Sequence, residues 1–494
     1  MLYLSRRQSK VIVIEILVII AIILFSNINF FALPNQDLFQ YIADGQRYLN
    51  FQLPSHIQAP PANPILISAI SRFFSHPHSE IISATSINIF SSLVTAYLVW
   101  KIGYKLFPSY AMFFFLLLVT NPVFYFVSLQ PTSEALFSLF ILLTLLSRVN
   151  RYPNLSLAIA SASYLIRYEG VLLVGSLLLF DWIGKTPYKT KKSVVFFSVL
   201  FIVCWSYLVF HTNETNSISS NAFIKELVMR QQEIFKPIKI TEYPKLFFQN
   251  PDLNQKVFLV VFYSLFLFSI IQSLIQRDMV LIMTTFSTFY LITHFLFPAV
   301  DNRYVFPVMP LVYIFFLVNI MKLCRQLSFS RLNLIQNKYF YQVLVLILII
   351  FIISSNILNI YWHLYHQQDV GKEYIMISNW LNTQQFSHQI VFITLEPWIL
   401  DYFVDNDQVT FYQQLQDLNT NQNKSLEDVL NDVQQKFPET EIFIENNNYT
   451  ATTNSSLAQM FGLRFFREIS SSPNLTLVKH LYNNRNWALI YRYE

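Results

Sequence analysis

Residues 11–31 read VIVIEILVIIAIILFSNINFF, an apolar run whose only charged residue is Glu15. A helix of this length crosses the hydrocarbon core of a bilayer, which is about 30 Å thick. The run has no small-residue cleavage site and no soluble domain directly after it, so we interpret it as an uncleaved anchor and not as a signal peptide. The sequence therefore predicts a membrane protein.

The composition agrees, since 54% of the residues are hydrophobic and 13% are charged, against roughly 25% charged in soluble proteins. Apolar runs recur along most of the chain and predict about 11 membrane-spanning helices. They lie near 11–31, 82–100, 109–128, 132–147, 154–167, 169–184, 193–210, 257–276, 279–298, 304–322 and 341–362. We expect a polytopic helical membrane domain over residues 1–365, with its first extracytoplasmic loop at 32–81, and a small soluble α/β domain over 366–494.

The basic residues orient these spans, because Lys and Arg favour short cytoplasmic loops. With the N-terminus inside, they fall in alternate connecting segments: Arg6, Arg7 and Lys10; Lys101 and Lys105; Arg148 and Arg151; Lys185, Lys189, Lys191 and Lys192; Arg277; Lys322, Arg325, Arg331 and Lys338. The opposing turn at 129–131 is uncharged. We predict an integral protein of the inner or plasma membrane, with a cytoplasmic N-terminus and an extracytoplasmic C-terminal domain.

Residues 60–74, PPANPILISAISRFF, interrupt this pattern. Their apolar part is too short to span, and a crossing here would place every later basic loop on the opposite side. We interpret the segment as an interfacial or re-entrant helix, with the prolines in its first turn, where a missing N–H costs little.

The C-terminal part contains short runs typical of strands, at 389–394, 408–412, 441–445, 475–482 and 487–494. Between the second and third runs lies a helix signature, with Ser425 as N-cap and Asp428 three residues later. Asp405-Asn406-Asp407 matches the triplet that holds a divalent cation in soluble sugar transferases, but Asp and Asn between a helix and a strand are ordinary turn formers, so we interpret it as a turn. Cys204 and Cys324 have neither disulfide nor metal spacing, and the net charge of +5 sits at helix ends, so no nucleic-acid partner is predicted.

Charged residues also occur at the predicted outer ends of the spans, where ionisable groups pair or serve a function by default. They are Asp37 and Asp44 in the first loop, Glu134 in QPTSEALF, Arg167 and Glu169 in LIRYEG, and Arg303 in DNRYVFP. Asp37 lies at headgroup depth, although a solvated loop carboxylate is the simpler reading of that residue alone. Arg167 and Glu169 occupy the tip between two short spans, so we expect them to be recessed, either as a site or as an ion pair that closes a tight turn.

These groups suit a substrate that is half lipid and half water-soluble, such as a lipid-linked sugar phosphate. Arginine offers a fixed fork of donors to phosphate oxygens, and a carboxylate can take the proton from an acceptor hydroxyl. The apolar spans can hold the lipid tail.

The order of the motifs along the chain resembles that of the GT-C glycosyltransferases. The shared pattern is an acidic first loop, Pro-Pro-x-x-Pro, Pro-Thr-Ser-Glu-Ala-Leu-Phe, Arg-x-Glu-Gly, and then Asn-Arg-Tyr-x-x-Pro-x-x-Pro. These enzymes use polyprenyl-phosphate sugars and include protein O-mannosyltransferases and aminoarabinose transferases. The resemblance covers nearly the whole chain, including the α/β tail. It implies that Asp37 is the catalytic carboxylate, and that Tyr41, Glu134, Arg167, Glu169, Arg303 and Tyr304 bind substrate, with both arginines near the donor phosphate.

The chain also departs from the pattern. Asp37 is flanked by Gln36 and Leu38 where many relatives carry two adjacent carboxylates, and Asn63 stands where an aromatic residue often follows the prolines. The acceptor and any metal requirement are therefore open; a divalent metal, if used, has Asp37 and Glu134 as its candidate ligands. The absence of a Trp-Trp-Asp motif argues against an oligosaccharyltransferase of the N-glycosylation kind.

We predict an inverting glycosyltransferase that moves a hexose or pentose from a polyprenyl-phosphate donor to a hydroxyl of a lipid, glycan or protein acceptor on the extracytoplasmic face. Two alternatives stay open. A transporter or flippase of lipid-linked saccharide needs the same arginines but does not need Asp37 placed for proton transfer. A non-catalytic membrane scaffold uses the C-terminal domain as a binding module.

Overall fold

The computed structural model describes residues 6–28, 36–54, 59–76, 78–184, 188–215, 255–296, 302–328, 360, 372–394, 397–412, 425–447, 468–469, 472–483 and 486–493. The chain divides into two compact units. The helical unit comprises residues 1–28 and 40–364, and the α/β unit comprises residues 29–39 and 365–494. The predicted span at 341–362 lies outside the described residues, apart from residue 360.

The first unit is built from helices, as its apolar runs predict. Its described elements are α1 (Arg6–Ser26), α2 (Gln36–Leu49, which begins in the α/β unit), α3 (Ala62–Ser71), α4 (Ser79–Leu106), the 3-10 turn η1 (Pro108–Tyr110), α5 (Ala111–Val119), α6 (Pro122–Leu129), α7 (Glu134–Val149), α8 (Pro153–Ser163), α9 (Gly170–Ile183), α10 (Lys192–Thr215), α14 (Gln255–Gln276), α15 (Val280–Leu296), α16 (Asn302–Val305) and α17 (Met309–Ser328).

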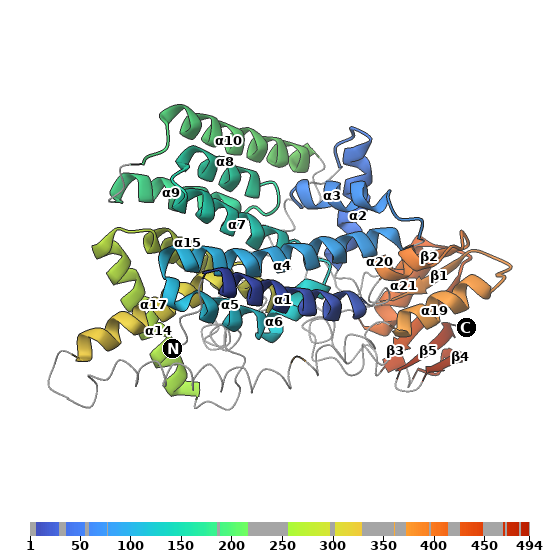
Figure 1. The fold of residues 1–494 in the computed structure, drawn as a ribbon. Coiled ribbons are helices and arrows are strands. Elements are labelled where there is room, and N and C mark those ends of the chain that lie inside the picture. The colour runs from blue at the N-terminus through green and yellow to red at the C-terminus, as the bar shows by residue number, and fades with distance from the viewer. Residues whose placement is uncertain are drawn as a thin grey trace. The chain divides into compact units, whose positions relative to one another are not determined.

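Helix α4 is central to the packing of this unit. It contacts α1, α5 and α7, while α7 packs on α8, and α8 on α9 and α10 (Figure 1). Buried side-chain hydrogen bonds also join helices of this unit: the Trp100 indole N–H donates to Ser9 Oγ at 2.9 Å, and the Asn121 amide donates to the Tyr313 hydroxyl of α17 at 2.7 Å. Such bonds fix the register of packed helices, because a buried polar group left unbonded is costly.

The predicted span near 109–128 is broken into two helices, α5 and α6. The structure bends by 59° between Pro108–Val119 and Pro122–Leu129. Pro122 has no N–H to bond the preceding turn, and Asn121 starts a new helix instead, because its side chain accepts a hydrogen bond from the Val123 backbone N–H at 2.8 Å. The Asn-Pro pair was the available signal, since it favours turns and helix starts.

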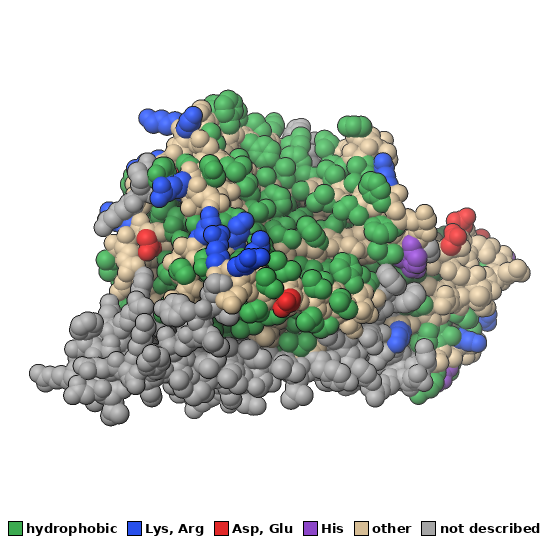
Figure 2. Space-filling model, viewed as in Figure 1, with side chains coloured by type: hydrophobic (Ala, Val, Ile, Leu, Met, Phe, Trp, Pro, Cys, Tyr) green, Lys and Arg blue, Asp and Glu red, His purple; other side chains and the backbone are tan. Residues whose placement is uncertain are grey.

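Three helices of the described part are long and apolar enough to cross a membrane: Arg6–Ser26, Ser79–Leu106 and Lys192–Val209, with the bent pair as a fourth if it counts as one span. Shorter apolar helices of 10–17 residues accompany them: Ala62–Ser71, Gly170–Ile183, Phe262–Gln276, Val280–His294 and Met309–Asn319. Hydrophobic side chains cover much of the visible surface of the helical unit (Figure 2). The predicted helical class is confirmed, while the number of spans stays a prediction.

Basic side chains gather at one end of the helical unit, where α1 begins and α4 ends (Figure 2). The Arg6 guanidinium lies 5.5 Å from the centroid of the Tyr104 ring, and the Lys105 ammonium donates to the Asn150 side chain. These helix ends are the ones that the charge pattern assigns to the cytoplasm.

The loop predicted to be the first extracytoplasmic one contains a helix, α2, that the sequence did not predict, followed by the short helix α3 that it did. A Cβ atom on Gly45 would overlap the Pro64 carbonyl oxygen and Ser68 Oγ, so α2 and α3 approach too closely for any side chain at position 45. The Ala62 backbone N–H donates to the Leu165 carbonyl at 2.9 Å, which fastens α3 to the turn after α8. The interfacial placement of α3 stays a prediction.

The α/β unit contains α19 (Lys372–Thr383), β1 (Ile390–Ile393), α20 (Pro397–Phe403), β2 (Val409–Tyr412), α21 (Leu426–Lys436), β3 (Glu441–Asn447), β4 (Leu475–Asn483) and β5 (Asn486–Tyr493). The strand order is β2-β1-β3-β5-β4. Strand β1 pairs in parallel with β2 and β3, and the remaining pairs, β3 with β5 and β5 with β4, are antiparallel. The predicted α/β sheet is confirmed.

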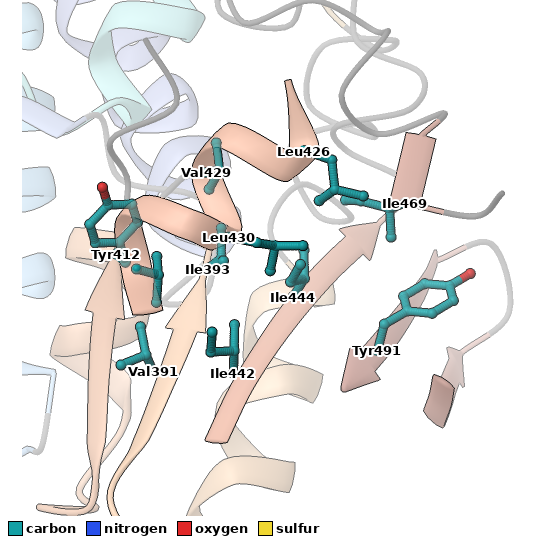
Figure 3. Close-up of a cluster of buried hydrophobic side chains, with 11 residues drawn as sticks. Val391, Ile393, Tyr412, Leu426, Val429, Leu430, Ile442, Ile444, Ile469 and Tyr491 are labelled. Carbon is teal, nitrogen blue, oxygen red and sulfur yellow. The ribbon is translucent and has the colours of Figure 1, made fainter. Parts of the chain in front are cut away.

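Helix α21 covers one face of this sheet with the apolar side chains that its spacing predicts. Val429 and Leu430 pack with Val391 and Ile444 in one buried cluster (Figure 3). Full burial of each such side chain stabilises the fold by about 1.5–3 kcal/mol. The helix begins with the predicted capping box, in which Ser425 and Asp428 bond each other's backbone N–H groups.

The Asp405-Asn406-Asp407 triplet forms a turn, as interpreted from the sequence. The Asn406 side-chain oxygen accepts from the Gln408 backbone N–H at 3.1 Å, and its carbonyl accepts from the Val409 N–H at 3.0 Å. Asn406 thus stabilises the turn that leads into β2.

Candidate active site

Glu134 lies at the centre of a buried charged cluster. It is the first residue of α7, where the helix dipole favours a carboxylate, and it is 1% exposed. Its Oε1 accepts a hydrogen bond from Arg167 Nη1 at 2.6 Å, and the same nitrogen donates to Ser133 Oγ at 3.2 Å. Glu134 and Arg167 are far apart in sequence, and the packing of α7 on α8 brings them together.

The other edge of the Arg167 guanidinium is held by a second carboxylate. Nη2 donates to Glu169 Oε1 at 2.8 Å and Nε to Oε2 at 3.3 Å, so the pair is bidentate. Gly170 permits this tight turn between α8 and α9, because a Cβ there would meet the backbone nitrogen of Tyr164. The Arg–Glu pair that the sequence suggested therefore forms. Both side chains are 14% exposed, in line with the predicted recessed position.

Arg303 reaches the same carboxylate from the other half of the helical unit. Its Nε lies 3.9 Å from Glu134 Oε1, a much longer approach than that of Arg167. Its Nη2 donates to the Tyr304 hydroxyl at 3.1 Å, and the guanidinium lies 5.0 Å from the centroid of that ring. Helix α16, which carries both residues, packs on α6.

His294 is a member of the cluster that the sequence analysis did not identify. It lies near the end of α15 and is 1% exposed, with Nε2 3.5 Å from Glu169 Oε1. Its ring stacks on that of Tyr304, with centroids 4.8 Å apart and planes 20° apart. The signal was a lone ionisable residue within an apolar run shortly before Arg303. We name Glu134, Arg167, Glu169, His294 and Arg303 the Glu134 cluster.

Tyr41 touches the edge of this cluster, since its hydroxyl donates to Ser133 Oγ at 3.4 Å. Asp37 lies one turn earlier on α2, at a spacing that puts both residues on one helix face. Asp37 is half-buried and belongs to the compact α/β unit, whereas Tyr41 belongs to the helical unit. Of the predicted site residues, the structure gathers Tyr41, Glu134, Arg167, Glu169, Arg303 and Tyr304, and it assigns Asp37 to the other unit.

The formal charges of the Glu134 cluster balance, with two carboxylates against two guanidiniums. Such buried pairs persist when their hydrogen bonds are well made, and Arg167 satisfies this condition with both acids. Arg303 lies farther from Glu134, at 3.9 Å. An anion that entered the cluster would therefore compete with a 3.9 Å contact at Arg303 and with much shorter contacts at Arg167.

One oxygen of the Glu134 carboxylate, Oε1, faces the guanidiniums of Arg167 and Arg303, and their positive charge opposes a divalent metal at that oxygen. Metal ligands of this class need free oxygen atoms in a region of negative potential. Among the described residues, no group of three or more His, Cys, Asp or Glu could hold a metal ion. The metal requirement stays a prediction.

Asp44 is a different kind of acid. It lies on α2, outside the predicted spans, and is 5% exposed. Burial raises its pKa to about 6, although the Arg47 charge and a hydrogen bond with Gln40 act in the opposite direction.

No protein-family model matches the sequence, and no curated protein matches it. Among solved structures, the chain is similar to ArnT from Cupriavidus metallidurans bound to undecaprenyl phosphate, with a TM-score of 0.56 and 12% identity over 97% of each chain. The apo state of that protein gives the same TM-score at 11% identity and the same coverage. An oligosaccharyltransferase from Archaeoglobus fulgidus in complex with Zn and sulfate has a TM-score of 0.51 at 9% identity, over 96% of this chain and 72% of its own.

The chain thus has the fold of the GT-C glycosyltransferases, which are membrane proteins. The resemblance inferred from the motif order is confirmed at the level of fold. Because the identities are 9–12%, the likeness is one of fold alone, and the chemistry has to be argued from the Glu134 cluster and α2.

Proposed function

We propose that this protein is an inverting glycosyltransferase that moves a sugar from a polyprenyl-phosphate donor to an acceptor hydroxyl. The observation that carries the proposal is the Glu134 cluster, a buried set of two guanidiniums and two carboxylates within an apolar helical unit. The fold supports it, because ArnT of the same fold is bound to undecaprenyl phosphate.

In this proposal the arginines recognise the donor phosphate. Arg303 contributes the primary contact, since its 3.9 Å approach to Glu134 is the easier one to exchange for a phosphate oxygen. Arg167 is held in a fixed orientation by Glu169 and Glu134 and supplies a preorganised positive charge. Tyr304 orients the Arg303 guanidinium through the 3.1 Å hydrogen bond.

The chemistry requires one proton transfer and one displacement. Asp37 accepts the proton of the acceptor hydroxyl, and the hydroxyl oxygen attacks the anomeric carbon from the face opposite the phosphate. The bond between the anomeric carbon and the phosphate oxygen breaks, and the polyprenyl phosphate leaves with the electron pair. The arginines stabilise the negative charge that develops on it.

The proposed topology follows from the basic residues. The end with Arg6 and Lys105 faces the cytoplasm, and the end with the Glu134 cluster faces outward, in a domain of about 11 spans. The α/β unit then lies outside. Single cysteines in place of Lys105 and Glu427, in a chain without Cys204 and Cys324, test this: an impermeant thiol reagent on intact cells should label only position 427, and labelling of position 105 contradicts the orientation.

The central experiment is Asp37→Asn in the full-length protein. The amide keeps the size of the side chain but cannot take the proton, so we expect donor binding to survive and transfer to fall at least about a hundredfold. Asp44→Asn, seven residues further along α2, is the matched control and should change transfer much less. Transfer by Asp37→Asn at the parental rate contradicts the proposal.

The same variants distinguish the alternative of a flippase for lipid-linked saccharide. A flippase needs the arginines to bind the phosphate, but it does not need a base. The Asp37→Asn variant of a flippase would therefore move the lipid across vesicle membranes as fast as the parent protein does. Arg303→Ala would then abolish movement in a protein that has no transferase activity.

A further inference from the structure

The segment that carries Asp37 is packed within the α/β unit. The unit boundary passes through α2, between Phe39 and Gln40. Phe39 is 8% exposed, and its ring lies 5.3 Å from the ring of Tyr402 in α20, centroid to centroid, at an interplanar angle of 58°. Leu38 is completely buried. Both neighbours that follow Asp37 are therefore fixed by packing, and Asp37 itself is half-buried.

Helix α20, which carries Tyr402, is firmly attached to the rest of its unit. Leu400 is completely buried, and the Tyr402 ring also packs edge-on against Phe403 at 5.1 Å. Asn382 of α19 bonds the chain at the end of α20 twice, donating to the Phe403 carbonyl at 3.0 Å and accepting from the Asp405 N–H at 2.8 Å. Tyr402 thus lies on a short helix whose C-terminal end is hydrogen-bonded to α19.

We propose that Tyr402 is a positioning residue for Asp37, so that the α/β unit sets where the base of the reaction lies. This inference rests on the role of Asp37 proposed above. Phe39 follows Asp37 by two positions on one helix, so a shift of the Phe39 ring moves the Asp37 backbone with it. Loss of the Tyr402 ring removes the aromatic partner that holds Phe39 within the unit.

The expected consequence is kinetic. A displacement of about 1 Å in a catalytic group can cost a hundredfold in rate. Because Tyr402 belongs to the α/β unit and the donor-binding arginines to the helical unit, its loss should act on the proton transfer and not on donor binding. Removal of the ring should therefore lower kcat and leave KM for the donor unchanged.

The test uses full-length protein and compares Tyr402→Ala, Tyr402→Leu and Tyr402→Phe. We expect kcat to fall about tenfold or more in the first two, with parental KM for the donor, and to return in Tyr402→Phe, which keeps the ring. Tyr482→Ala removes an exposed aromatic side chain from β4 of the same unit and should behave as the parent. Tyr402→Leu keeps an apolar side chain and guards against a general loss of folding in Tyr402→Ala.

A double variant separates this inference from the proposed function. If Tyr402 acts through Asp37, Asp37→Asn/Tyr402→Ala should transfer no more slowly than Asp37→Asn alone. Parental kcat in Tyr402→Ala and Tyr402→Leu, with an impaired Asp37→Asn, overturns the inference and leaves the function standing. Additive losses, or a rise in KM for the donor, also overturn it. Parental transfer by Asp37→Asn overturns the function itself.

Discussion

Helices α7 and α9 carry buried charges at both ends, and the two ends differ. At one end, Arg148 pairs with Asp181, and their side chains are 3% and 13% exposed. The Asp181 carboxylate also accepts from the Thr190 backbone N–H at 3.1 Å, and the Arg148 guanidinium lies 5.2 Å from the centroid of the Phe180 ring. This is one cation with one anion, closed by backbone and aromatic contacts.

At the other end, the Glu134 cluster contains several charges at graded distances. Arg167 lies within 2.8 Å of both acids, while His294 and Arg303 approach them only at 3.5 and 3.9 Å. In the pair of Arg148 with Asp181, each charge has its partner within the pair, and we infer that the pair stabilises the fold. A cluster with long outer contacts can exchange one of them for a ligand at small cost, which is the property that a phosphate site requires.

The largest effect expected from this comparison is on stability at the first end. Asp181→Asn leaves the Arg148 guanidinium buried without its carboxylate, so we expect a loss of about 3–5 kcal/mol in unfolding free energy. The transfer rate per folded molecule should not change. Thermal unfolding of the detergent-purified protein measures the first quantity, and activity normalised to the folded fraction measures the second.

The control for that variant is Glu134→Gln at the opposite end. Arg167 keeps its bidentate partner Glu169, so the stability loss should be the smaller of the two, while transfer should fall because both arginines lose a shared anchor. Equal effects of Glu134→Gln and Asp181→Asn on both quantities would erase the distinction between the two ends.

Asp44 differs from the acids at both ends of α7 and α9, because it is a buried carboxylate with a raised pKa. Its folded pKa of about 6 lies above the ordinary value of 3.8, so the folded state binds this proton more tightly than the unfolded state. The tighter proton binding stabilises the folded state at low pH, and this stabilisation is lost as the pH rises from about 4 to about 6. Relative to low pH, the free energy of unfolding at neutral pH is therefore lower by about 3 kcal/mol. Asp44→Asn should therefore stabilise the protein by up to that amount at pH 7.5 and by almost nothing at pH 4. Unfolding curves at the two pH values that shift equally would show that Asp44 is not responsible.

The smallest expected effect concerns the donor. Arg303→Ala should weaken binding of undecaprenyl phosphate by about 1.5–3 kcal/mol, roughly tenfold to a hundredfold, with little change in unfolding temperature because its contact with Glu134 is long. Arg151→Ala, which removes an arginine from the opposite end, should bind as the parent does. Parental affinity in Arg303→Ala would move the phosphate role to Arg167.

Much of the fold could be predicted because its signals are local. The strands near 389–394 and 441–445, the capping box at Ser425 and the short helix after the paired prolines all depend on neighbouring residues, and the structure has them. The bend at Asn121-Pro122 carried a local signal too, but the unbroken apolar run outweighed it.

The sequence could point to most residues of the candidate site, but it could not predict how they are arranged. Arg167 and Glu169 are two residues apart, and their pairing could be expected from the sequence. The contact of Glu134 with Arg303 depends on how distant helices pack, which no local pattern encodes. His294 was overlooked because a histidine in an apolar run resembles a core residue until its neighbours are known. The catalytic role of Asp37 stays a prediction.

The hydrogen bond between Asn121 and Tyr313 has a consequence for biogenesis. The two residues are 192 positions apart, and they join the bend before α6 to a helix made much later. At roughly 5–20 residues per second, synthesis of the intervening chain takes on the order of 10–40 seconds. During that interval Asn121 has been made and Tyr313 has not, so this contact between the early helices and α17 can form only after residue 313 has been synthesised.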